Sequence, residues 1–401
     1  MNVFISPSSA NGTVNAPSSK SCAHRLLICA ALSDGVSVVE NIGTNDDILA
    51  TADCLKAMGA AVDINGTTAT VKGIGTQDKK QEIQLFCNES GSTLRFLIPL
   101  TLVFSEKCCF SGSGRLMSRP QNVYKELFSE KNCTLENMGG TLTASGKLKS
   151  GIYKIRGDVS SQFITGLLFT LPLLDGDSEI VLTTPLQSAP YVDITIDALS
   201  LFGVTVNKTQ NGYFIKGKQK YISRNLSAEG DWSNAAFLDA FNIAGGSVTV
   251  TGLNEDSFQG DKIYREFYAK LSNGTPEFDI SDCPDLGPIL ITCAVLKHGA
   301  LIKGTERLKI KESDRGAAMA QELKKFGVNI EIGNDYIKVP DVIPQKPDSE
   351  ICCHNDHRIA MSFAVLCSVT GGTLQDAQCV NKSYPDFFTD IKNLGIIYKT
   401  I

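Results

Sequence analysis

The stretch LKAMGAAVDINGTTATVKG, residues 55–73, decides the fold because its pattern recurs four more times along the chain. Each copy begins with an apolar residue, has a glycine four positions later and continues in a short run typical of a β-strand. The other copies are LENMGGTLTASGKLKSGIYKIRG (135–157), LSLFGVTVNKTQNGYFIKG (199–217), LKKFGVNIEIGNDYIKVP (323–340) and IKNLGIIYKTI (391–401). A degraded sixth copy, YAKLSNGTPEF (268–278), lies in the longest gap.

The shared pattern predicts a helix, a glycine cap and a β-hairpin. The aligned glycines are Gly59, Gly139, Gly203, Gly327 and Gly395. A helix can end there because glycine readily takes a left-handed conformation, and an N-G or similar turn then joins two strands. One such copy would carry little weight, since many α/β proteins contain one. Five copies predict a six-unit α/β architecture in two similar halves, with a site for chemistry between the halves.

Two stretches of small, polar and turn-forming residues are the best candidates for domain crossovers. They are PSSANGTVNAPSSK (7–20) and SAEGDWSNAAF (227–237). If both are crossovers, residues 20–227 form an inserted domain. Residues 1–19 and 228–401 then form the other domain, which includes the first strand.

Composition indicates an ordinary globular protein of more than one core, with 401 residues, 42% hydrophobic and 20% charged. We find no apolar run long enough for a membrane span and no secretory signal. Thirteen cysteines without C-x-x-C pairs favour reduced thiols and a cytoplasmic location. The net charge of −5 gives no reason to expect nucleic acid or an anionic membrane as a partner.

Seven polar loops nevertheless place basic or hydroxyl side chains before apolar segments. These residues are Lys20, Ser21 and Arg25; Arg95; Arg115 and Arg119; Ser160, Ser161 and Gln162; Arg307, Lys311 and Arg315; Arg358; and Lys382. Helix starts bind anions through unpaired N–H groups, and arginine matches carboxylate and phosphate. A single such loop is usually a helix cap or a solvated cation. Seven in an acidic protein predict small substrates that carry phosphate and carboxylate groups.

Several cofactor and enzyme classes are not indicated. The sequence has no G-x-x-x-x-G-K-[ST] motif, no G-x-G-x-x-G after a strand and no G-x-S-x-G elbow. The stretch CCHNDH (352–357) could be a metal cluster. Adjacent cysteines on a strand point to opposite faces, however, and the spacing fits no standard zinc site. We therefore expect neither a nucleotide cofactor nor a zinc site at this stretch.

Two carboxylates lie among the basic loops and are candidates for acid–base chemistry. Asp285 lies in SDCPDLGPIL, and Glu312 follows Lys311 in KIKESDR. A carboxylate beside a lysine is more often an exposed ion pair. If it faces a closed cleft, it becomes a candidate general acid or base.

Ten motifs occur in order along residues 1–401: SKSCAHR, ESGSTLR, GRLMSRP, SSQF, SAPYVDIT, EGDWS, PDLGP, KIKESDR, NDHRIAM and NKSYPDFF. With them the chain resembles the 5-enolpyruvylshikimate-3-phosphate synthases of the enolpyruvyl transferase family. The resemblance implies two similar domains, each of three βαβαββ units, with the active site in the interdomain cleft. It also implies transfer of the enolpyruvyl group of phosphoenolpyruvate to the 5-hydroxyl of shikimate 3-phosphate, with release of phosphate.

This reaction belongs to the shikimate pathway to chorismate and the aromatic amino acids, and the family needs no cofactor. A cytoplasmic monomer is expected, with small-molecule substrates as its only partners.

Matching the motifs implies a role for each residue. Shikimate 3-phosphate is expected at Lys20, Ser21, Arg25, Ser160, Ser161, Gln162, Ser188, Tyr191, Asp285 and Lys311. Phosphoenolpyruvate is expected at Lys20, Gly91, Arg115, Gln162, Arg315, Arg358 and Lys382. Asp285 is expected to accept the proton of the 5-hydroxyl. Glu312, Lys20 and His357 are expected to manage protonation of the methylene carbon.

The chain departs from the family pattern at Glu89 and Arg307, where many members carry asparagine. Both departures bear on the response to glyphosate, the family's inhibitor, which the resemblance therefore does not predict. The nearest alternative is the cell-wall transferase that acts on UDP-N-acetylglucosamine. It carries a cysteine in the loop that matches SGSGRLMSRP, whereas Cys108 and Cys109 lie before that loop here.

An alternative from a different class is an anion-binding protein without activity. Asp285, Glu312 and Lys20 argue against it, because binding alone needs no paired acid and base.

Overall fold

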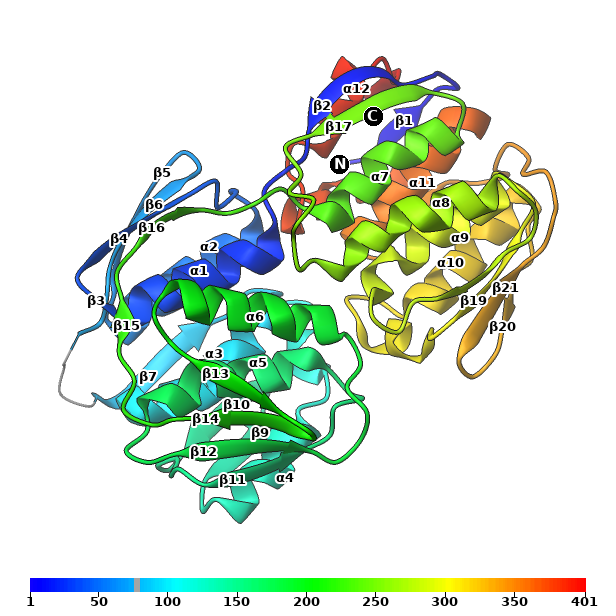
Figure 1. The fold of residues 1–401 in the computed structure, drawn as a ribbon. Helices are drawn as coiled ribbons and strands as arrows, with labels where there is room; N and C mark the ends of the chain where they lie inside the picture. The colour runs from blue at the N-terminus through cyan, green and yellow to red at the C-terminus, as the bar shows by residue number, and fades with distance from the viewer. Residues whose placement is uncertain (76–79) are drawn as a thin grey trace. The chain divides into compact units, whose positions relative to one another are not determined.

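The computed structural model describes residues 1–75 and 80–401 of the chain (Figure 1). They form two compact units. The insert unit comprises Ser18–Glu229, and the outer unit comprises Met1–Pro17 together with Gly230–Ile401. The insert unit is thus one continuous segment of chain, and the outer unit is made from both ends of the chain.

The strands of the insert unit form three four-stranded sheets and one two-stranded pair. The first sheet has the order β16-β4-β6-β5, with β4 (Val36–Glu40), β5 (Ala61–Asn65), β6 (Thr68–Lys72) and β16 (Asn225–Ser227). The second has the order β7-β8-β10-β9, with β7 (Lys80–Phe86), β8 (Ser105–Ser111), β9 (Thr134–Met138) and β10 (Thr141–Ser145). The third has the order β11-β12-β14-β13, with β11 (Ile152–Ile155), β12 (Ser178–Leu182), β13 (Val206–Thr209) and β14 (Gly212–Ile215). The pair joins β3 (Ser33–Asp34) and β15 (Tyr221–Ile222).

The outer unit has two four-stranded sheets and one pair. One sheet has the order β18-β19-β21-β20, with β18 (Glu277–Asp279), β19 (Ala300–Lys303), β20 (Glu331–Ile332) and β21 (Tyr336–Val339). The other has the order β22-β23-β1-β24, with β1 (Val3–Ile5), β22 (Ile351–Cys352), β23 (Gly372–Gln375) and β24 (Tyr398–Thr400). The pair joins β2 (Asn11–Asn15) and β17 (Ser247–Thr251).

Helices connect these strands in both units. Those of the insert unit are α1 (Lys20–Leu32), α2 (Asp46–Met58), α3 (Gly91–Phe104), α4 (Asn122–Glu130), α5 (Ser161–Thr170) and α6 (Ala189–Leu201), with short 3-10 helices η1 (Leu116–Ser118) and η2 (Leu171–Leu173). Those of the outer unit are α7 (Trp232–Ile243), α8 (Tyr264–Leu271), α9 (Gly287–Val295), α10 (Arg315–Leu323), α11 (His357–Thr370) and α12 (Phe387–Asn393). Its 3-10 helices are η3 (Gly260–Ile263), η4 (Pro284–Leu286), η5 (Glu306–Ile310), η6 (Lys324–Phe326) and η7 (Ala377–Lys382).

All five four-stranded sheets share one pattern of pairing. The first two strands are parallel, and the next two pairings are antiparallel, as in Tyr153↔Ile180 followed by Ile180↔Tyr213. In chain order each sheet follows a β-α-β-α-β-β course, with β1 and β16 entering from distant parts of the sequence (Figure 1). The repeated α/β architecture predicted from the glycine pattern is confirmed. The degraded copy, residues 268–278, spans the end of α8 and the start of β18, which follow one another without a hairpin, and the outer unit has the parallel pair β2–β17 in place of a third four-stranded sheet.

The predicted caps are confirmed at four of the five aligned glycines. Gly59, Gly203, Gly327 and Gly395 have φ angles of 121°, 82°, 76° and 101°. The next residue then donates its N–H to a carbonyl five residues earlier, as Ala60 does to Leu55 at 3.0 Å. This bond satisfies a carbonyl that the helix end leaves unpaired.

The prediction was wrong at Gly139. Thr134–Met138 form β9, and Gly139 lies in the turn of the hairpin instead of at a helix end. The cap of α4 is Asn132, with a φ of 55°, and Cys133 donates its N–H to Phe128 O at 2.9 Å. Asparagine tolerates the left-handed conformation better than other residues with a side chain, so it takes the place of glycine in this copy.

Each unit has its own hydrophobic core. The first helix of each repeat is buried on nearly all sides: every residue from Cys22 to Leu32 of α1 and every residue of α9 is buried. The second helix buries only one face, as α10 does through Arg315, Met319 and Glu322. The basic residues of α1, α3 and α11 lie within the first two turns of these helices.

Candidate active site

Three helix starts of the insert unit carry residues predicted to bind substrate. The side chains of Ser19, Ser90 and Ser160 cap α1, α3 and α5 by accepting from backbone N–H groups in the first turn. Lys20 and Ser21 follow in α1, Gly91 begins α3, and Ser161 and Gln162 begin α5. A cap takes one of the four N–H groups that a helix start leaves unpaired, so the others remain available to an anion.

Gln162 connects two of these helix starts. Its Nε2 donates to Ser92 Oγ at 3.0 Å, and its Oε1 accepts from Arg95 Nη1 at 2.8 Å. A β-carbon added at Gly91 would lie 2.5 Å from Arg119 Nη1 and 3.8 Å from Gln162 Oε1. A side chain at position 91 would therefore displace the Arg119 guanidinium from its place beside Gly91.

The structure distinguishes the two arginines of the GRLMSRP motif. Arg115 is exposed at the start of η1. Arg119 is half-buried and lies beside Gly91 and Gln162, both predicted to bind phosphoenolpyruvate. Sequence reasoning assigned the ligand contact to Arg115, and the spacing within the motif offered no signal for choosing between the two.

Arg25 is buried at the centre of the insert unit's site residues. Its Nε donates to Thr195 Oγ1 at 2.8 Å, its Nη2 to Tyr191 O at 2.8 Å and its Nη1 to Ser21 O at 2.6 Å. Burial lowers the pKa of Arg25 to about 10, so the guanidinium stays charged at neutral pH. Three predicted residues, Ser21, Arg25 and Tyr191, are thus brought together. Ser188, also predicted, is buried before α6 with a left-handed φ of 56°.

Lys20 forms an ion pair that the sequence did not predict. Its Nζ lies 2.6 Å from Asp47 Oδ2, and the two side chains are 15% and 10% exposed. Asp47 lies in the first turn of α2, where a carboxylate also interacts favourably with the helix dipole. The pair holds a predicted catalytic lysine in one position.

In the outer unit, four predicted residues meet at Asp285, in η4. Lys311 Nζ and Arg315 Nη1 lie 3.0 and 2.8 Å from Asp285 Oδ1, and Arg358 Nη2 lies 3.1 Å from Oδ2. Burial raises the pKa of the Asp285 carboxyl, but the positive charges of Arg358, Lys311 and Arg315 outweigh it and hold that pKa well below its ordinary value. We call these four residues the Asp285 cluster.

Arg315 connects the cluster to further carboxylates. It is 1% exposed, and its Nη2 and Nε lie 2.7 Å from Glu312 Oε2 and 2.9 Å from Asp356 Oδ2. Asp356, which sequence reasoning missed, also caps α11 by accepting from Arg358 N at 2.9 Å. Asp356 is fully buried, binds Arg315 and caps the helix that carries Arg358. It therefore fixes the positions of both arginines.

Lys382 and His357, the remaining predicted residues of the outer unit, are buried near the start of α11. Lys382 Nζ donates to Asn355 O at 2.7 Å, and His357 Nδ1 lies 4.0 Å from Asp356 Oδ1.

Burial lowers the pKa of Lys311, and the negative charge of Asp285 offsets only part of this effect.

The two residues that depart from the family pattern are also placed. Arg307 is buried and donates to Ser281 O at 3.4 Å. A β-carbon added at Gly114 would lie 2.5 Å from Glu89 Oε2, so Glu89 packs against that glycine.

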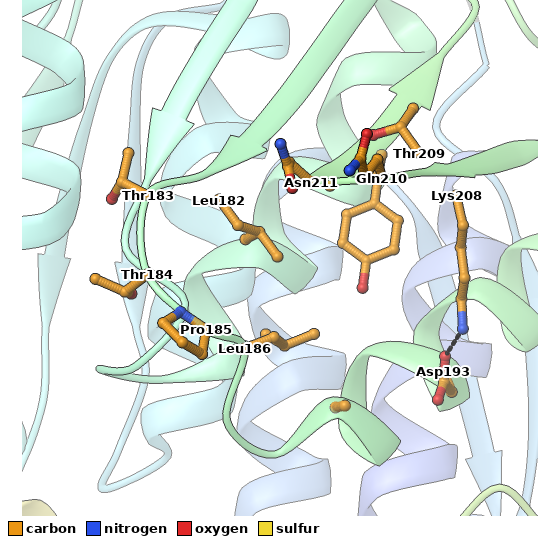
Figure 2. Close-up of a pocket in the computed structure, with 13 residues that line it drawn as sticks. Leu182, Thr183, Thr184, Pro185, Leu186, Asp193, Lys208, Thr209, Gln210 and Asn211 are labelled. Carbon is orange, nitrogen blue, oxygen red and sulfur yellow. Dashed lines mark hydrogen bonds and ion pairs between the residues drawn. The ribbon is translucent and has the colours of Figure 1, made fainter.

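A pocket of about 520 Å³ lies elsewhere on the insert unit, between the segment after β12, the start of α6 and the β13–β14 hairpin. Figure 2 shows its lining, with Lys208 Nζ paired to Asp193 Oδ1 at 2.6 Å. The residues predicted to bind substrate do not line it.

Within residues 1–75 and 80–401, no group of three or more His, Cys, Asp or Glu side chains is placed to hold a metal ion. Nor does any helix of those ranges have the length and apolar character that a membrane span requires.

Comparison with known families bears on the chemistry of these residues. The family model described as EPSP synthase (3-phosphoshikimate 1-carboxyvinyltransferase) matches residues 5–391. The chain belongs to the EPSP synthase family. The predicted family, the α/β fold class and the predicted 3-phosphoshikimate 1-carboxyvinyltransferase activity are confirmed.

Individual relatives agree with this assignment over the full chain. The 3-phosphoshikimate 1-carboxyvinyltransferase of Clostridium kluyveri is 41% identical over 98% of this chain and 97% of its own length. That of Clostridium beijerinckii is 40% identical over 99% and 98%.

Two solved structures share the fold. The EPSP synthase of Acinetobacter baumannii superposes with a TM-score of 0.78 at 22% identity, covering 99% of both chains. The enolpyruvyl transferase NikO of Streptomyces tendae superposes with a TM-score of 0.79 at 14% identity, covering 99% of this chain and 98% of its own.

Proposed function

We propose that the chain transfers the enolpyruvyl group of phosphoenolpyruvate to the 5-hydroxyl of shikimate 3-phosphate and releases phosphate. The observation that carries the proposal is the Asp285 cluster, in which one half-buried carboxylate faces three cations within 3.1 Å. A reaction between two anionic substrates needs cations to offset their repulsion and a base at the attacking hydroxyl. The cluster supplies both kinds of group in one place.

The proposed reaction has two stages. In the first stage, Asp285 accepts the proton of the 5-hydroxyl of shikimate 3-phosphate. The oxygen of that hydroxyl bonds to C2 of phosphoenolpyruvate, and C3 of phosphoenolpyruvate gains a proton. The C2–O bond to the phosphoryl group then breaks, phosphate leaves with the electron pair, and C3 loses a proton to restore the double bond. Glu312, Lys20 and His357 are the proposed groups for protonation at C3. Positioned groups of this kind typically contribute about 10² to 10⁴-fold each.

The remaining residues are proposed to bind the substrates. Those for shikimate 3-phosphate are Lys20, Ser21, Arg25, Ser160, Ser161, Gln162, Ser188, Tyr191, Asp285 and Lys311. Those for phosphoenolpyruvate are Lys20, Gly91, Arg115, Gln162, Arg315, Arg358 and Lys382, to which the position of the Arg119 guanidinium beside Gly91 adds Arg119. A cytoplasmic location, a monomeric state and the absence of a cofactor stay predictions.

Phosphate release from phosphoenolpyruvate tests the proposal. The purified chain is assayed separately with shikimate 3-phosphate and with UDP-N-acetylglucosamine as acceptor. We expect release only with the first. Release only with the second would transfer the chain to the cell-wall branch of the fold, and no release with either would contradict a catalytic role.

A further inference from the structure

Two consecutive residues between β22 and α11 have an unfavourable backbone conformation. His354 and Asn355 have φ angles of 50° and 52°. Among the residues that the structure describes, eight non-glycine residues have positive φ, and these two are the only adjacent ones. Such conformations persist only where the surroundings hold them, and they occur mostly at functional sites. The segment ends at Asp356, His357 and Arg358, so its shape decides where these residues lie.

The strained segment faces a proposed ligand contact on one side. The carbonyl of Asn355 accepts from Lys382 Nζ at 2.7 Å, and Lys382 is 7% exposed. A buried ammonium group with a fixed acceptor is held in one direction. The position of the Asn355 carbonyl therefore determines where the charge of Lys382 is presented.

On the other side, a fully buried carboxylate of α10 holds the segment. Glu322 is 0% exposed; its Oε2 accepts from Cys352 N at 2.9 Å and its Oε1 lies 2.9 Å from His354 Nε2. Lys325 Nζ lies 2.7 Å from Glu322 Oε2 and balances the charge of the carboxylate. Burial raises the pKa of Glu322, but these donors outweigh it and keep that pKa below its ordinary value, so the group is an anion at neutral pH.

Arg315 and Glu322 lie seven positions apart on the buried face of α10, two turns from each other. Arg315 binds Asp356 at the end of the segment, and Glu322 binds Cys352 and His354 at its start. The segment is thus fixed at both ends by one helix. We propose that Glu322 is a positioning residue, which acts through His354 and the Asn355 carbonyl to orient Lys382 toward phosphoenolpyruvate. This proposal rests on the proposed function and on the role given there to Lys382.

Steady-state kinetics of Glu322→Gln test the proposal. Glu331→Gln is the matched control, because it makes the same change in the same unit at an exposed carboxylate that accepts from Tyr336 Oη at 2.6 Å. We expect the KM for phosphoenolpyruvate to rise about tenfold in Glu322→Gln, the effect of one weakened charge-assisted hydrogen bond. The KM for shikimate 3-phosphate stays within about twofold in both variants, as expected for a change of little free energy.

A double variant separates positioning from general damage. If Glu322 acts through Lys382, Glu322→Gln causes no further rise in KM once Lys382→Met is present. An equal rise in both backgrounds, an unchanged KM for phosphoenolpyruvate, or an equal rise in KM for both substrates would overturn the proposal.

If Glu322→Gln does not fold, the proposal is tested by comparing the KM for phosphoenolpyruvate of His354→Gln with that of His354→Phe. The amide of His354→Gln can still donate to Glu322 and should keep the KM for phosphoenolpyruvate near the unmodified value, whereas His354→Phe should raise it. Equal values for the two would count against the proposal. Failure of the unmodified chain to release phosphate would instead refute the proposed function, so the two failures are distinguishable.

Discussion

Asp285 is held by the same cations that we propose to bind the substrates. Lys311, Arg315 and Arg358 keep its pKa well below the ordinary value of 3.8 against the opposing effect of burial, which makes it a weak base. If substrate phosphate and carboxylate groups bind these cations as proposed, we expect less positive charge to act on Asp285 and its pKa to rise. The carboxylate then becomes a stronger base only where a substrate is present to use it.

Asp285→Asn should therefore separate binding from turnover. Removing the carboxylate takes one anionic partner away from each of three cations, so phosphoenolpyruvate should bind severalfold more tightly. Loss of the base should lower kcat by about a hundredfold or more. Calorimetric titration in the presence of shikimate 3-phosphate measures the first effect, and a phosphate-release assay measures the second. Weaker binding together with near-normal turnover would contradict the role given to Asp285.

His24 should make stability depend on pH. It is 1% exposed, its Nδ1 lies 2.7 Å from Thr51 Oγ1, and burial, followed by the charges of Lys20 and Arg25, lowers its pKa well below 6.5. The unfolded chain takes up this proton near its ordinary pKa and the folded chain does not. The contribution of neutral His24 to the free energy of unfolding is therefore complete above pH 6.5, and it is lost as the pH falls below that value.

We expect the free energy of unfolding to fall by about 1.4 kcal/mol per pH unit below pH 6.5 through this group. Urea unfolding at several pH values measures it, and His24→Gln should remove this component of the slope. The control is His298→Gln, at a side chain 58% exposed, which should keep the slope. Equal slopes in the unmodified chain and in His24→Gln would refute the expectation.

At the scale of elements, the glycine pattern predicted the helix caps because a left-handed residue is a strong steric requirement that one residue type satisfies best. It failed at Asn132, where a different residue satisfies the same requirement and the next glycine along the chain belongs to a hairpin turn. A pattern based on residue type cannot detect such a substitution. The hydrogen bond from Cys133 N to Phe128 O shows that the geometry itself is kept.

Gly327→Ala should measure what this cap contributes. The φ of Gly327 is 76°, and an added β-carbon would meet only Gln345, at 3.7 Å or more. Steric overlap is therefore small, and the cost is that of a left-handed alanine, about 1 to 2 kcal/mol. Chemical denaturation should show this loss in the free energy of unfolding, while Asn132→Gly should show a gain. A variant Gly327→Ala as stable as the unmodified chain would contradict the account of the caps.

Individual residues of the candidate site could be predicted where a single loop carries the pattern. Contacts between residues far apart in the sequence could not. The basic loops indicated Lys20, Arg25, Lys311, Arg315 and Arg358 as candidates from local sequence alone. The ion pairs of Lys20 with Asp47 and of Arg315 with Asp356 span 27 and 41 positions. No local pattern records which carboxylate the fold brings to which cation, and for the same reason Arg119 was not separated from Arg115.

At the scale of the whole molecule, each unit has a separate hydrophobic core, and the insert unit is one continuous segment. A fragment of residues 18–229 should therefore fold alone with a cooperative thermal transition. It should release no phosphate from phosphoenolpyruvate, because Asp285 and Arg315 lie in the outer unit. Circular dichroism during heating measures the first property. A non-cooperative transition would contradict the independence of this core.

We propose that this chain joins phosphoenolpyruvate to shikimate 3-phosphate. Mass spectrometry of the acceptor after incubation of both substrates with the chain tests it most directly. We expect a new species equal to shikimate 3-phosphate plus one enolpyruvyl group, formed in equal amount to the phosphate released and formed about a hundredfold more slowly with Asp285→Asn. Unchanged shikimate 3-phosphate after incubation with the folded, unmodified chain would contradict it.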